Sequence, residues 1–480
     1  MKRPRVLLVK SRSLATKLRG ASMPPLGLLY IASFLRSRLS ADVRLLDARL
    51  ESDILSAVAA AVRASRPDVV GVSALTAEAF LAHKIAAAVK AADPSVPVVL
   101  GGPYPSSDPE GALADANTDA AAIGEGEETF AELARVIAEE GPRWNAPGAA
   151  DGVAGLALRA GGAVTRTPAR VPAVHPDDLP FPAWDLVDYK RFWKTGGMAS
   201  VGVRPYLPLY TSRGCPFHCV YCHQIFGKTF RGRSPESVAA EVEMIRSLGT
   251  REIEVLDDVA NYDPDRFDGL LQELLRRGLD PVLNFPNGLR ADLLRESTAD
   301  LLKRAGTADV AMGLETASPR LQKLINKNLS MEAATRGIDL LASRRIFCRG
   351  LFLLGLPTET ESEMRATIRY ACGSRLHLAL FFTPTPFPGT GLYELFRSAG
   401  KLPQDRSSID FEYTAAPFNA SAMSDATYLR LYRGAFLKFH LNPARVFRIV
   451  RDGPTGWDFP ARAFRLFRNH LSFGRLSERA

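Results

Sequence analysis

Residues 206–223 read YLPLYTSRGCPFHCVYCH, an apolar segment that runs directly into a loop holding three cysteines. Aromatic and branched side chains in the segment 206–212 predict a β-strand. The cysteines that follow, Cys215, Cys219 and Cys222, have C-x3-C-x2-C spacing, which on a tight loop brings three thiolates close together. A strand that ends in such a loop indicates the carboxyl edge of a sheet, where open α/β folds place their ligand sites.

The chain after this loop repeats a strand followed by a helix. Five more strand candidates occur at 252–257, 281–285, 309–314, 347–355 and 376–382. Helical segments separate them, at 235–248, 266–277, 291–305, 331–343 and 361–371. Six such units predict a partial (β/α)6 barrel over residues 201–400, smaller than the eight-fold barrel, with its site at the carboxyl ends of the strands.

The chain before the loop alternates in the same way. Apolar runs occur at 6–9, 43–46, 69–73, 96–100 and 121–124, with helical segments between them. This pattern predicts an α/β domain over residues 1–140 with a doubly wound parallel sheet of the flavodoxin or Rossmann type. Dense Gly and Pro make 141–200 a linker with room for one hairpin. Residues 401–480 form a helical, basic region.

Length and composition indicate a multidomain protein and argue against a membrane-spanning or secreted one. With 480 residues the chain is long enough for two to four domains. No apolar run approaches the roughly 18–20 residues of a membrane span, and the apolar stretch near the N-terminus is too short for a secretory signal, so we expect a cytoplasmic protein. The formal net charge of +9 is weak support for nucleic-acid binding.

Five cysteines in so long a chain are not a disulfide framework. Structural zinc sites usually have four protein ligands, and a [4Fe–4S] cluster usually has four cysteines. Three cysteines would leave one iron open to an exogenous ligand, which indicates chemistry. The neighbouring His218 and His223 keep a catalytic zinc site open as an alternative. Cys348 and Cys372 stand apart and are expected to be buried small side chains.

The motif CPFHCVYC resembles the cluster motif of the radical S-adenosylmethionine (SAM) superfamily, with Tyr221 in its aromatic position. The resemblance implies that the three cysteines bind a [4Fe–4S] cluster and that SAM chelates its fourth iron. It also implies SAM contacts from Tyr221 and from strand-end residues Asp258, Asn284 and Glu315. The superfamily's Gly-Gly-Glu is absent at Asp257-Asp258. These polar residues could equally be turn formers or helix caps.

The N-terminal region carries Ser73 and Leu75 after one strand and Gly101-Gly102 after another. Together with Glu125 after the fifth strand, they resemble the strand-end residues of cobalamin-binding domains, where small residues admit the cofactor's nucleotide tail. Such a domain ahead of the barrel resembles the B12-dependent radical SAM family. The first loop, residues 10–27, contains no histidine, so we expect cobalamin to bind without a protein imidazole under cobalt.

The basic tail interleaves arginines with aromatic residues: Arg430, Arg433, Arg445, Arg448, Arg451, Arg462, Arg465 and Arg468 alternate with Phe436, Phe439, Phe447, Phe464 and Phe467. A helical cap on the barrel with arginines at its rim explains this pattern. Contact with an anionic membrane surface and binding of nucleic acid are the alternatives, the last of them the least favoured.

The resemblance implies an enzyme that methylates an unactivated carbon of a small-molecule substrate, through a 5′-deoxyadenosyl radical and methylcobalamin. A low-potential donor such as flavodoxin or ferredoxin would reduce the cluster. Oxidative cyclisation or rearrangement without methyl transfer, as the anaerobic porphyrin-ester cyclases imply, is the nearest alternative. A non-catalytic corrinoid-binding protein is an alternative of another class. A tRNA methylthiotransferase would carry three further cysteines upstream, and this chain has none before Cys215.

Overall fold

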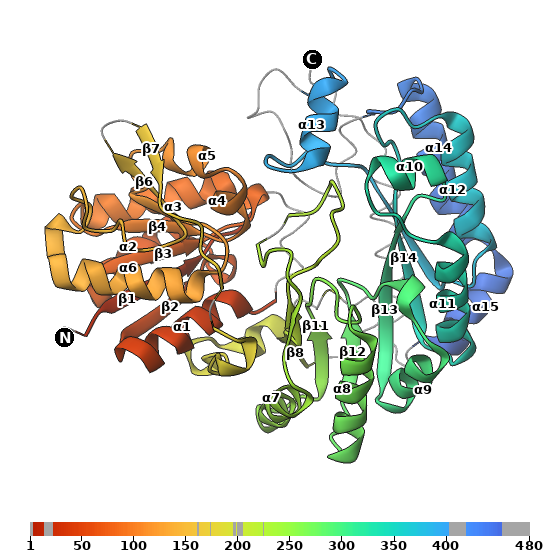
Figure 1. Cartoon of the computed structure of the whole chain (residues 1–480), viewed down its shortest axis with the longest axis horizontal. Helices are drawn as coiled ribbons and strands as arrows, with labels where there is room; N and C mark the ends of the chain where they lie inside the picture. The colour runs from red at the N-terminus through yellow and green to blue at the C-terminus, as the bar shows by residue number, and fades with distance from the viewer. Residues whose placement is uncertain are drawn as a thin grey trace. The chain divides into compact units, whose positions relative to one another are not determined.

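The computed structural model describes residues 3–13, 23–160, 163–172, 174–194, 198, 205–223, 225–402 and 419–453. The chain divides into two units. Unit 1 comprises Met1–Thr195 and the short segment His223–Thr229, and unit 2 comprises Gly196–Cys222 and Phe230–Ala480. Figure 1 labels the elements of both.

Unit 1 is built on a seven-stranded sheet in the order β2-β1-β3-β4-β5-β6-β7. The first five strands are parallel, and the hairpin β6-β7 adds two antiparallel strands beside β5. The strand bounds are Arg5–Lys10 (β1), Asp42–Asp47 (β2), Val69–Ser73 (β3), Val98–Gly101 (β4), Ala120–Ala122 (β5), Leu156–Ala160 (β6) and Ala163–Arg166 (β7). The predicted doubly wound sheet is confirmed, and the hairpin expected within 141–200 extends it.

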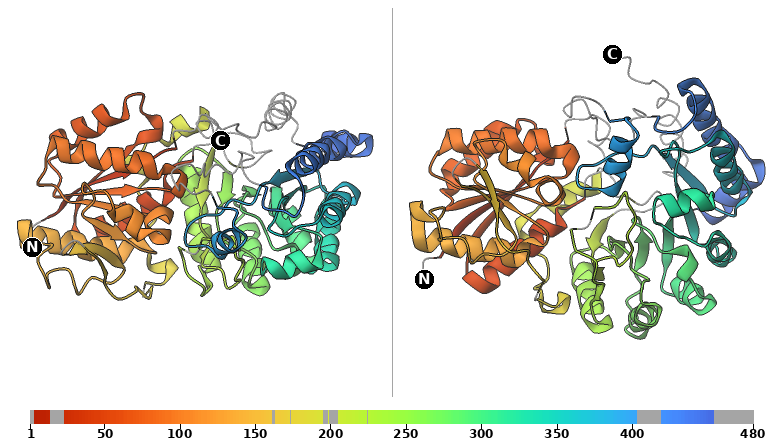
Figure 2. Two further views of the ribbon diagram at one scale, coloured as in Figure 1. Left: turned by 90° about the horizontal axis from the view of Figure 1, so that it is seen from above. Right: turned by 45° about the horizontal axis from the view of Figure 1, so that its top comes forward.

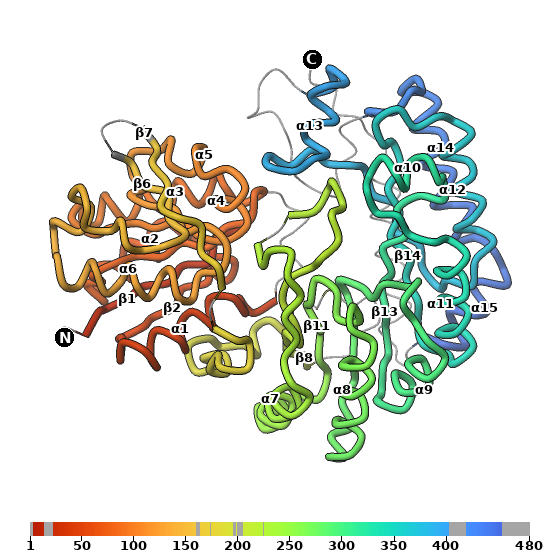
Figure 3. Tube along the Cα trace, in the orientation of Figure 1, coloured from red at the N-terminus to blue at the C-terminus, as the bar shows by residue number. Residues whose placement is uncertain are grey.

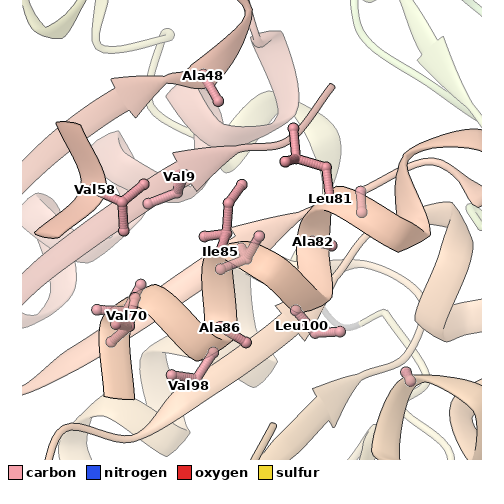
Figure 4. Packing of buried hydrophobic residues seen from close by; sticks show 14 of the residues in the cluster. Val9, Ala48, Val58, Val70, Leu81, Ala82, Ile85, Ala86, Val98 and Leu100 are labelled. Atoms are coloured by element: carbon pink, nitrogen blue, oxygen red, sulfur yellow. The ribbon is translucent and has the colours of Figure 1, made fainter. Parts of the chain in front are cut away.

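The helices of unit 1 pair off around the sheet: α1 (Leu26–Leu39) packs beside α6 (Gly126–Glu140), and α2 (Ile54–Ser65) packs beside α3 (Ala79–Ala92). Two short helices, α4 (Pro103–Ser107) and α5 (Pro109–Leu113), follow β4. Figure 4 shows the core between the sheet and the α2–α3 layer, where Val9, Val70 and Val98 meet Val58 and Ile85. These strands are apolar on both faces because helices cover both.

Unit 2 contains a six-stranded sheet in the order β15-β14-β13-β12-β11-β8, parallel throughout. The strand bounds are Tyr206–Leu209 (β8), Glu252–Val255 (β11), Val282–Phe285 (β12), Thr307–Glu315 (β13), Phe347–Leu353 (β14) and Leu378–Phe382 (β15). A small antiparallel pair, β9 (Ser212–Arg213) and β10 (Arg231–Gly232), flanks the cysteine loop. Figure 3 follows the chain through this partial barrel, which the sequence pattern predicted.

Helices cover the outside of this barrel, as the two views of Figure 2 show. They include α7 (Pro235–Ser247), α8 (Pro264–Arg276), α9 (Glu296–Arg304), α11 (Met331–Ser343) and α12 (Glu361–Gly373). The short helices α10 (Pro319–Leu324) and α13 (Gly391–Ser398) follow β13 and β15. Short polar side chains start many of them. Ser234, Ser318 and Thr360, for example, each accept a backbone N–H in the first turn of α7, α10 and α12.

The basic region forms two described helices, α14 (Asp425–His440) and α15 (Pro443–Asp452). α14 packs on α12 and β15, which agrees with a helical cap on the barrel. The remainder of the tail, including Arg462, Arg465 and Arg468 with Phe464 and Phe467, lies outside the described residues. Within the described ranges, no helix combines the length and the apolar character that crossing a bilayer requires.

Candidate cofactor sites of the two units

In unit 2, the cysteine loop begins at an anchored strand end. The Asp257 carboxylate, which follows β11 and is buried, accepts the Thr211 backbone N–H at 2.7 Å. It also accepts the hydroxyls of Thr211 and Ser212. The guanidinium of Arg266 donates to the Thr211 carbonyl from the other side. These contacts fix the chain three residues ahead of Cys215.

The far end of the loop is held by α10 and by the residues after it. The Val220 N–H donates to the Ile325 carbonyl at 3.0 Å, and the Val220 carbonyl accepts the Leu392 N–H at 2.7 Å. The Asn326 side chain donates to the His218 carbonyl at 3.0 Å. Val220 and Tyr221 also pack on an apolar cluster of Leu321, Ile325 and Leu356. The loop is therefore fixed mainly through its backbone, which leaves the cysteine side chains available.

The three cysteines of the loop form no disulfide and differ in exposure. Cys219 is buried, Cys215 is half-buried and Cys222 is exposed. Cys219 and Cys222 share a hydrogen bond, which lowers the pKa of the Cys219 thiol and raises that of Cys222. A [4Fe–4S] cluster usually has four cysteine ligands, so three cysteines on one loop could bind three of its irons and leave the fourth to another ligand. In the part of the chain that the structure describes, no three His, Cys, Asp or Glu side chains surround a single-ion position.

The two histidines beside the cysteines lie differently. His218 is exposed, and its backbone carbonyl is the acceptor for Asn326. His223 belongs to unit 1, where its Nδ1 lies 2.8 Å from the Ser107 hydroxyl on α4. Of the two remaining cysteines, Cys348 is fully buried and Cys372 is half-buried, which is close to what the sequence predicted.

Tyr221 and Glu315 come together as the site prediction requires. The Tyr221 hydroxyl donates to Glu315 Oε1 at 2.9 Å, and Lys327 Nζ lies 3.2 Å from the same oxygen. Burial opposes the charge of Lys327, but Glu315 and the thiols of Cys219 and Cys222 raise its pKa above the usual value. Sequence reasoning missed Lys327. Its signal is a lone lysine in the loop after α10, INKN at 325–328.

Asp258 and Asn284 were predicted at neighbouring strand ends. Asp258 is exposed beside the buried Asp257. Asn284 is fully buried on β12, where its amide donates to Glu252 Oε1 at 3.1 Å. Asn284 lies on the strand expected for it, whereas Asp258 lies three residues beyond the end of β11. No described hydrogen bond joins either residue to Tyr221 or Glu315.

Glu359, in the segment after β14, is a second residue that sequence reasoning missed. It is fully buried, and its Oε2 accepts the backbone N–H groups of Gly355 and Leu356 at 2.5 and 3.0 Å. Burial raises its pKa to about 7, against the lowering effect of those two hydrogen bonds. Glu359 therefore fixes the turn that follows β14, at the same barrel edge as Glu315.

In unit 1, the predicted cobalamin residues lie at the carboxyl edge of the sheet. Lys10 of β1 is in register with Ser73 of β3, and Ser73 is in register with Gly101 of β4. A Cβ built on Gly101 would meet no atom within 4 Å, whereas one on Gly102 would lie 3.1 Å from the Ala74 carbonyl. Gly102 also has a φ of +92°, which favours glycine. This edge has open space beside Gly101 and close packing at Gly102.

Leu75 and Glu125 belong to the same edge. Leu75 is 43% exposed, an unusual state for a leucine, and its N–H donates to Glu78 Oε2 at 2.8 Å. Glu125 immediately precedes α6. Glu78 also forms an ion pair with the buried Lys10, a pair that the sequence analysis did not identify. The small groups at this edge leave room for a bulky cofactor, and the polar groups beside them can accept or donate hydrogen bonds.

Histidine is absent from residues 10–27, of which 14–22 lie outside the described residues. His83, on α3, is directed at other partners: its Nε2 lies 2.9 Å from the Tyr104 hydroxyl and its Nδ1 lies 3.3 Å from Asp115. These contacts agree with cobalamin binding without a protein imidazole, and they do not test it.

Comparison with known proteins agrees with this two-part arrangement. A model described as "B12 binding domain" matches residues 13–134, and one described as "Radical SAM superfamily" matches residues 209–371. The chain is 31% identical to "Uncharacterized methyltransferase PH0819" of Pyrococcus horikoshii, over 92% of this chain and 94% of the relative. It is 26% identical to "Anaerobic magnesium-protoporphyrin IX monomethyl ester cyclase" of Rubrivivax gelatinosus, over 88% and 74%.

Among solved structures, the fold resembles the radical SAM methyltransferase TsrM from Kitasatospora setae with cobalamin and a [4Fe–4S] cluster bound. The TM-score is 0.73 at 18% identity, and the match covers 99% of this chain and all of that one. At 18% identity, this similarity is evidence for a shared fold.

Proposed function

This chain belongs to the radical SAM proteins that carry an N-terminal B12-binding domain, and from that premise we propose that it transfers a methyl group to an unactivated carbon. Its cofactors are a [4Fe–4S] cluster, SAM and cobalamin. The observation that carries the proposal is the order of the two domains on one chain, shared along 92% of its length with a relative named as a methyltransferase.

We assign the cluster to Cys215, Cys219 and Cys222, whose loop is anchored by Asp257 ahead of them and by Ile325 behind them. The hydrogen bond with Cys222 lowers the pKa of the Cys219 thiol, which favours the thiolate form that ligation requires. We assign SAM contacts to Tyr221, Asp258, Asn284 and Glu315. Support is strongest for Tyr221 and Glu315, which the structure joins through a hydrogen bond beside Cys219 and Cys222.

Cobalamin contacts are assigned to Ser73, Leu75, Gly101, Gly102 and Glu125. The open space at Gly101 and the exposed Leu75 support this assignment, since a bulky corrin and its nucleotide tail need close approach to the backbone. When bound, the cofactors supply the radical and the methyl group, and the chain binds them, orients the substrate and excludes water.

Anaerobic reconstitution of the iron–sulfur cluster, followed by incubation with cobalamin, methyl-labelled SAM and dithionite as the reductant, tests the function. We expect the substrate to gain one labelled methyl group, with 5′-deoxyadenosine and S-adenosylhomocysteine formed in equal amounts. Deoxyadenosine without any S-adenosylhomocysteine would contradict methyl transfer. No deoxyadenosine at all would favour a non-catalytic corrinoid-binding protein.

Oxidative cyclisation or rearrangement is the second candidate, because the chain also resembles the anaerobic cyclase of Rubrivivax gelatinosus over 88% of its length. Product mass separates the two reactions. Methylation adds one CH2 and consumes two SAM molecules per turnover, whereas an oxidative cyclisation removes hydrogen and consumes one.

Further proposals concern partners and organisation. A small-molecule substrate, lipid-like or a natural-product intermediate, and a low-potential donor such as flavodoxin or ferredoxin fit the chemistry. The boundaries 1–140, 141–200, 201–400 and 401–480 remain predictions, as does a cytoplasmic location.

A further inference from the structure

Helix α15 contacts the rest of unit 2 through charged side chains at both of its ends. Arg445, in its first turn, is 2% exposed, and its Nη2 donates to the carbonyls of Cys372 and Ser374 at 2.7 and 3.1 Å. Its guanidinium carbon also lies 3.4 Å from the ring centre of Phe439 on α14. The carbonyls at the end of α12 are the negative pole of that helix, so a cation is favoured there.

The last turn of α15 is held on the same side. Asp452 lies seven residues after Arg445, two helical turns further along the same face. Its Oδ2 lies 3.1 Å from His377 Nε2, and its carboxylate also pairs with Arg451. With both ends fixed, α15 cannot roll about its axis.

This attachment leaves an apolar face outward. Val446, Phe447 and Val450, at helical spacings of three and four, are 46%, 66% and 70% exposed, and Leu441 just ahead of the helix is 63% exposed. A surface helix of a globular protein ordinarily turns such residues inward. In Figure 1, α15 (dark blue) lies at the outer side of the helical layer of unit 2. We call these four residues the α15 apolar face.

Helices α14 and α15 carry a net positive charge. Between Asp425 and Asp452 the chain carries six Lys or Arg residues and two Asp residues. Asp452 is paired and its side chain is fully buried. Arg451 is exposed in the last turn of α15 itself, and Lys438 is exposed in the last turn of α14, three residues ahead of Leu441. Exposed apolar side chains with cations nearby are the combination that inserts at the headgroup level of anionic bilayers.

We propose that α15 docks the protein on the surface of an anionic bilayer, with the α15 apolar face at the boundary between headgroups and acyl chains. The cationic side chains beside it contact lipid phosphates. Exposed cationic side chains alone could also bind nucleic acid. Four exposed aliphatic and aromatic side chains, however, favour contact with lipid over contact with a phosphate backbone. The proposal is independent of the reaction that the enzyme catalyses.

Vesicle flotation of the full chain tests this docking. The probes are vesicles of phosphatidylcholine alone and vesicles that contain one third phosphatidylglycerol. We expect the protein to float with the anionic vesicles only, and less at high salt. Phe447→Ser with Val450→Ser should lower the bound fraction roughly tenfold, because the anchor is lost. Val171→Ser, at an 82% exposed valine of unit 1, is the matched control and should bind like the unchanged protein.

Both substituted side chains are exposed, so the double variant should keep its melting temperature. Leu441→Ser is a second, independent variant that should weaken binding in the same direction. The proposal is overturned if the unchanged protein ignores anionic vesicles, or if the double variant floats equally well. It is also overturned if the face instead drives self-association, seen as a dimer in light scattering that the double variant abolishes, or if it retains duplex DNA in place of vesicles.

Discussion

Glu315 combines an unusual backbone conformation with an ion pair at the carboxyl edge of the barrel. Its φ of +60° lies in the left-handed region, which a glutamate rarely adopts. Gly313 gives its carboxylate room, because a Cβ there would lie 2.7 Å from Glu315 Oε1 and 2.9 Å from Lys327 Nζ. Backbone strain at an ion pair beside the cysteine loop is typical of a functional position.

Glu315→Gln should show how much this pair contributes. The glutamine keeps the shape but removes the charge, so Lys327 loses its counter-ion in a site where its side chain is only 13% exposed. We expect the free energy of unfolding to fall by about 2 kcal/mol and SAM affinity to fall with it, measured by denaturant titration and equilibrium dialysis. Tyr221→Phe, which removes one hydrogen bond and no charge, should cost about 1 kcal/mol. Equal stability of Glu315→Gln and the unchanged protein would show that the pair contributes nothing.

At the scale of elements, the strands and most helices were predictable because their apolar periods are local. The contacts that position the cysteine loop were not. Asp257 and Thr211 are 46 residues apart, and Val220 meets Ile325 and Leu392 only after the barrel forms. The sequence alone did not distinguish Asp257 from Asp258. The structure shows that Asp257 is buried and anchors the loop, whereas Asp258 is exposed.

Asp257→Asn should loosen the cysteine loop. An amide cannot accept all three hydrogen bonds that the carboxylate receives, and each bond to a charged group contributes about 1.5–3 kcal/mol. We expect iron and sulfide content after anaerobic reconstitution to fall at least severalfold while cobalamin retention stays unchanged. Asp265→Asn, at a carboxylate 86% exposed on α8, is the matched control. Full iron content in Asp257→Asn would mean that the loop holds its cluster without this anchor.

The hydrogen bond that holds the end of α15 should make the stability of the protein depend on pH through His377. The Cys348 N–H donates to His377 Nδ1 at 3.0 Å, so the ring is neutral and its Nε2 donates to Asp452. Burial lowers the pKa of His377 to about 4. Although burial opposes its charge, hydrogen bonds from Arg451 and His377 lower the pKa of Asp452 to about 2, so it stays ionised above pH 4.

Because the unfolded chain binds a proton at His377 near pH 6.5 and the folded chain does so only near pH 4, stability is lost as the pH falls between these values. The loss is up to about 3 kcal/mol. His377→Gln cannot titrate, so its disadvantage relative to the unchanged protein should shrink from pH 7 to pH 4.5 in urea unfolding followed by circular dichroism. A disadvantage that stays constant across that range would exclude this histidine as the titrating group.

At the scale of the whole molecule, the order of a B12-binding domain and a radical SAM barrel was predictable because each carries its own local signature. The cysteine spacing marks one, and Ser73 with Gly101-Gly102 marks the other. The apolar side of α15 was not predictable. In the sequence its arginines and aromatic residues simply alternate, and only the burial of Arg445 determines which side faces outward.

Two variants should separate the contributions of the units. Cys219→Ala removes a proposed cluster ligand of unit 2, and we expect it to abolish deoxyadenosine formation while cobalamin is retained. Gly101→Leu places a side chain at the sheet edge of unit 1, where its Cβ would meet no atom within 4 Å, so we expect the fold to persist while cobalamin absorbance falls at least about tenfold. Deoxyadenosine should still form in that variant, without methylated product.

The control for Gly101→Leu is Gly152→Leu, at an exposed loop glycine that also has open space, and this variant should retain cobalamin. Normal methylation by Gly101→Leu would place the corrinoid away from this edge, because a leucine and the cofactor cannot share the same space.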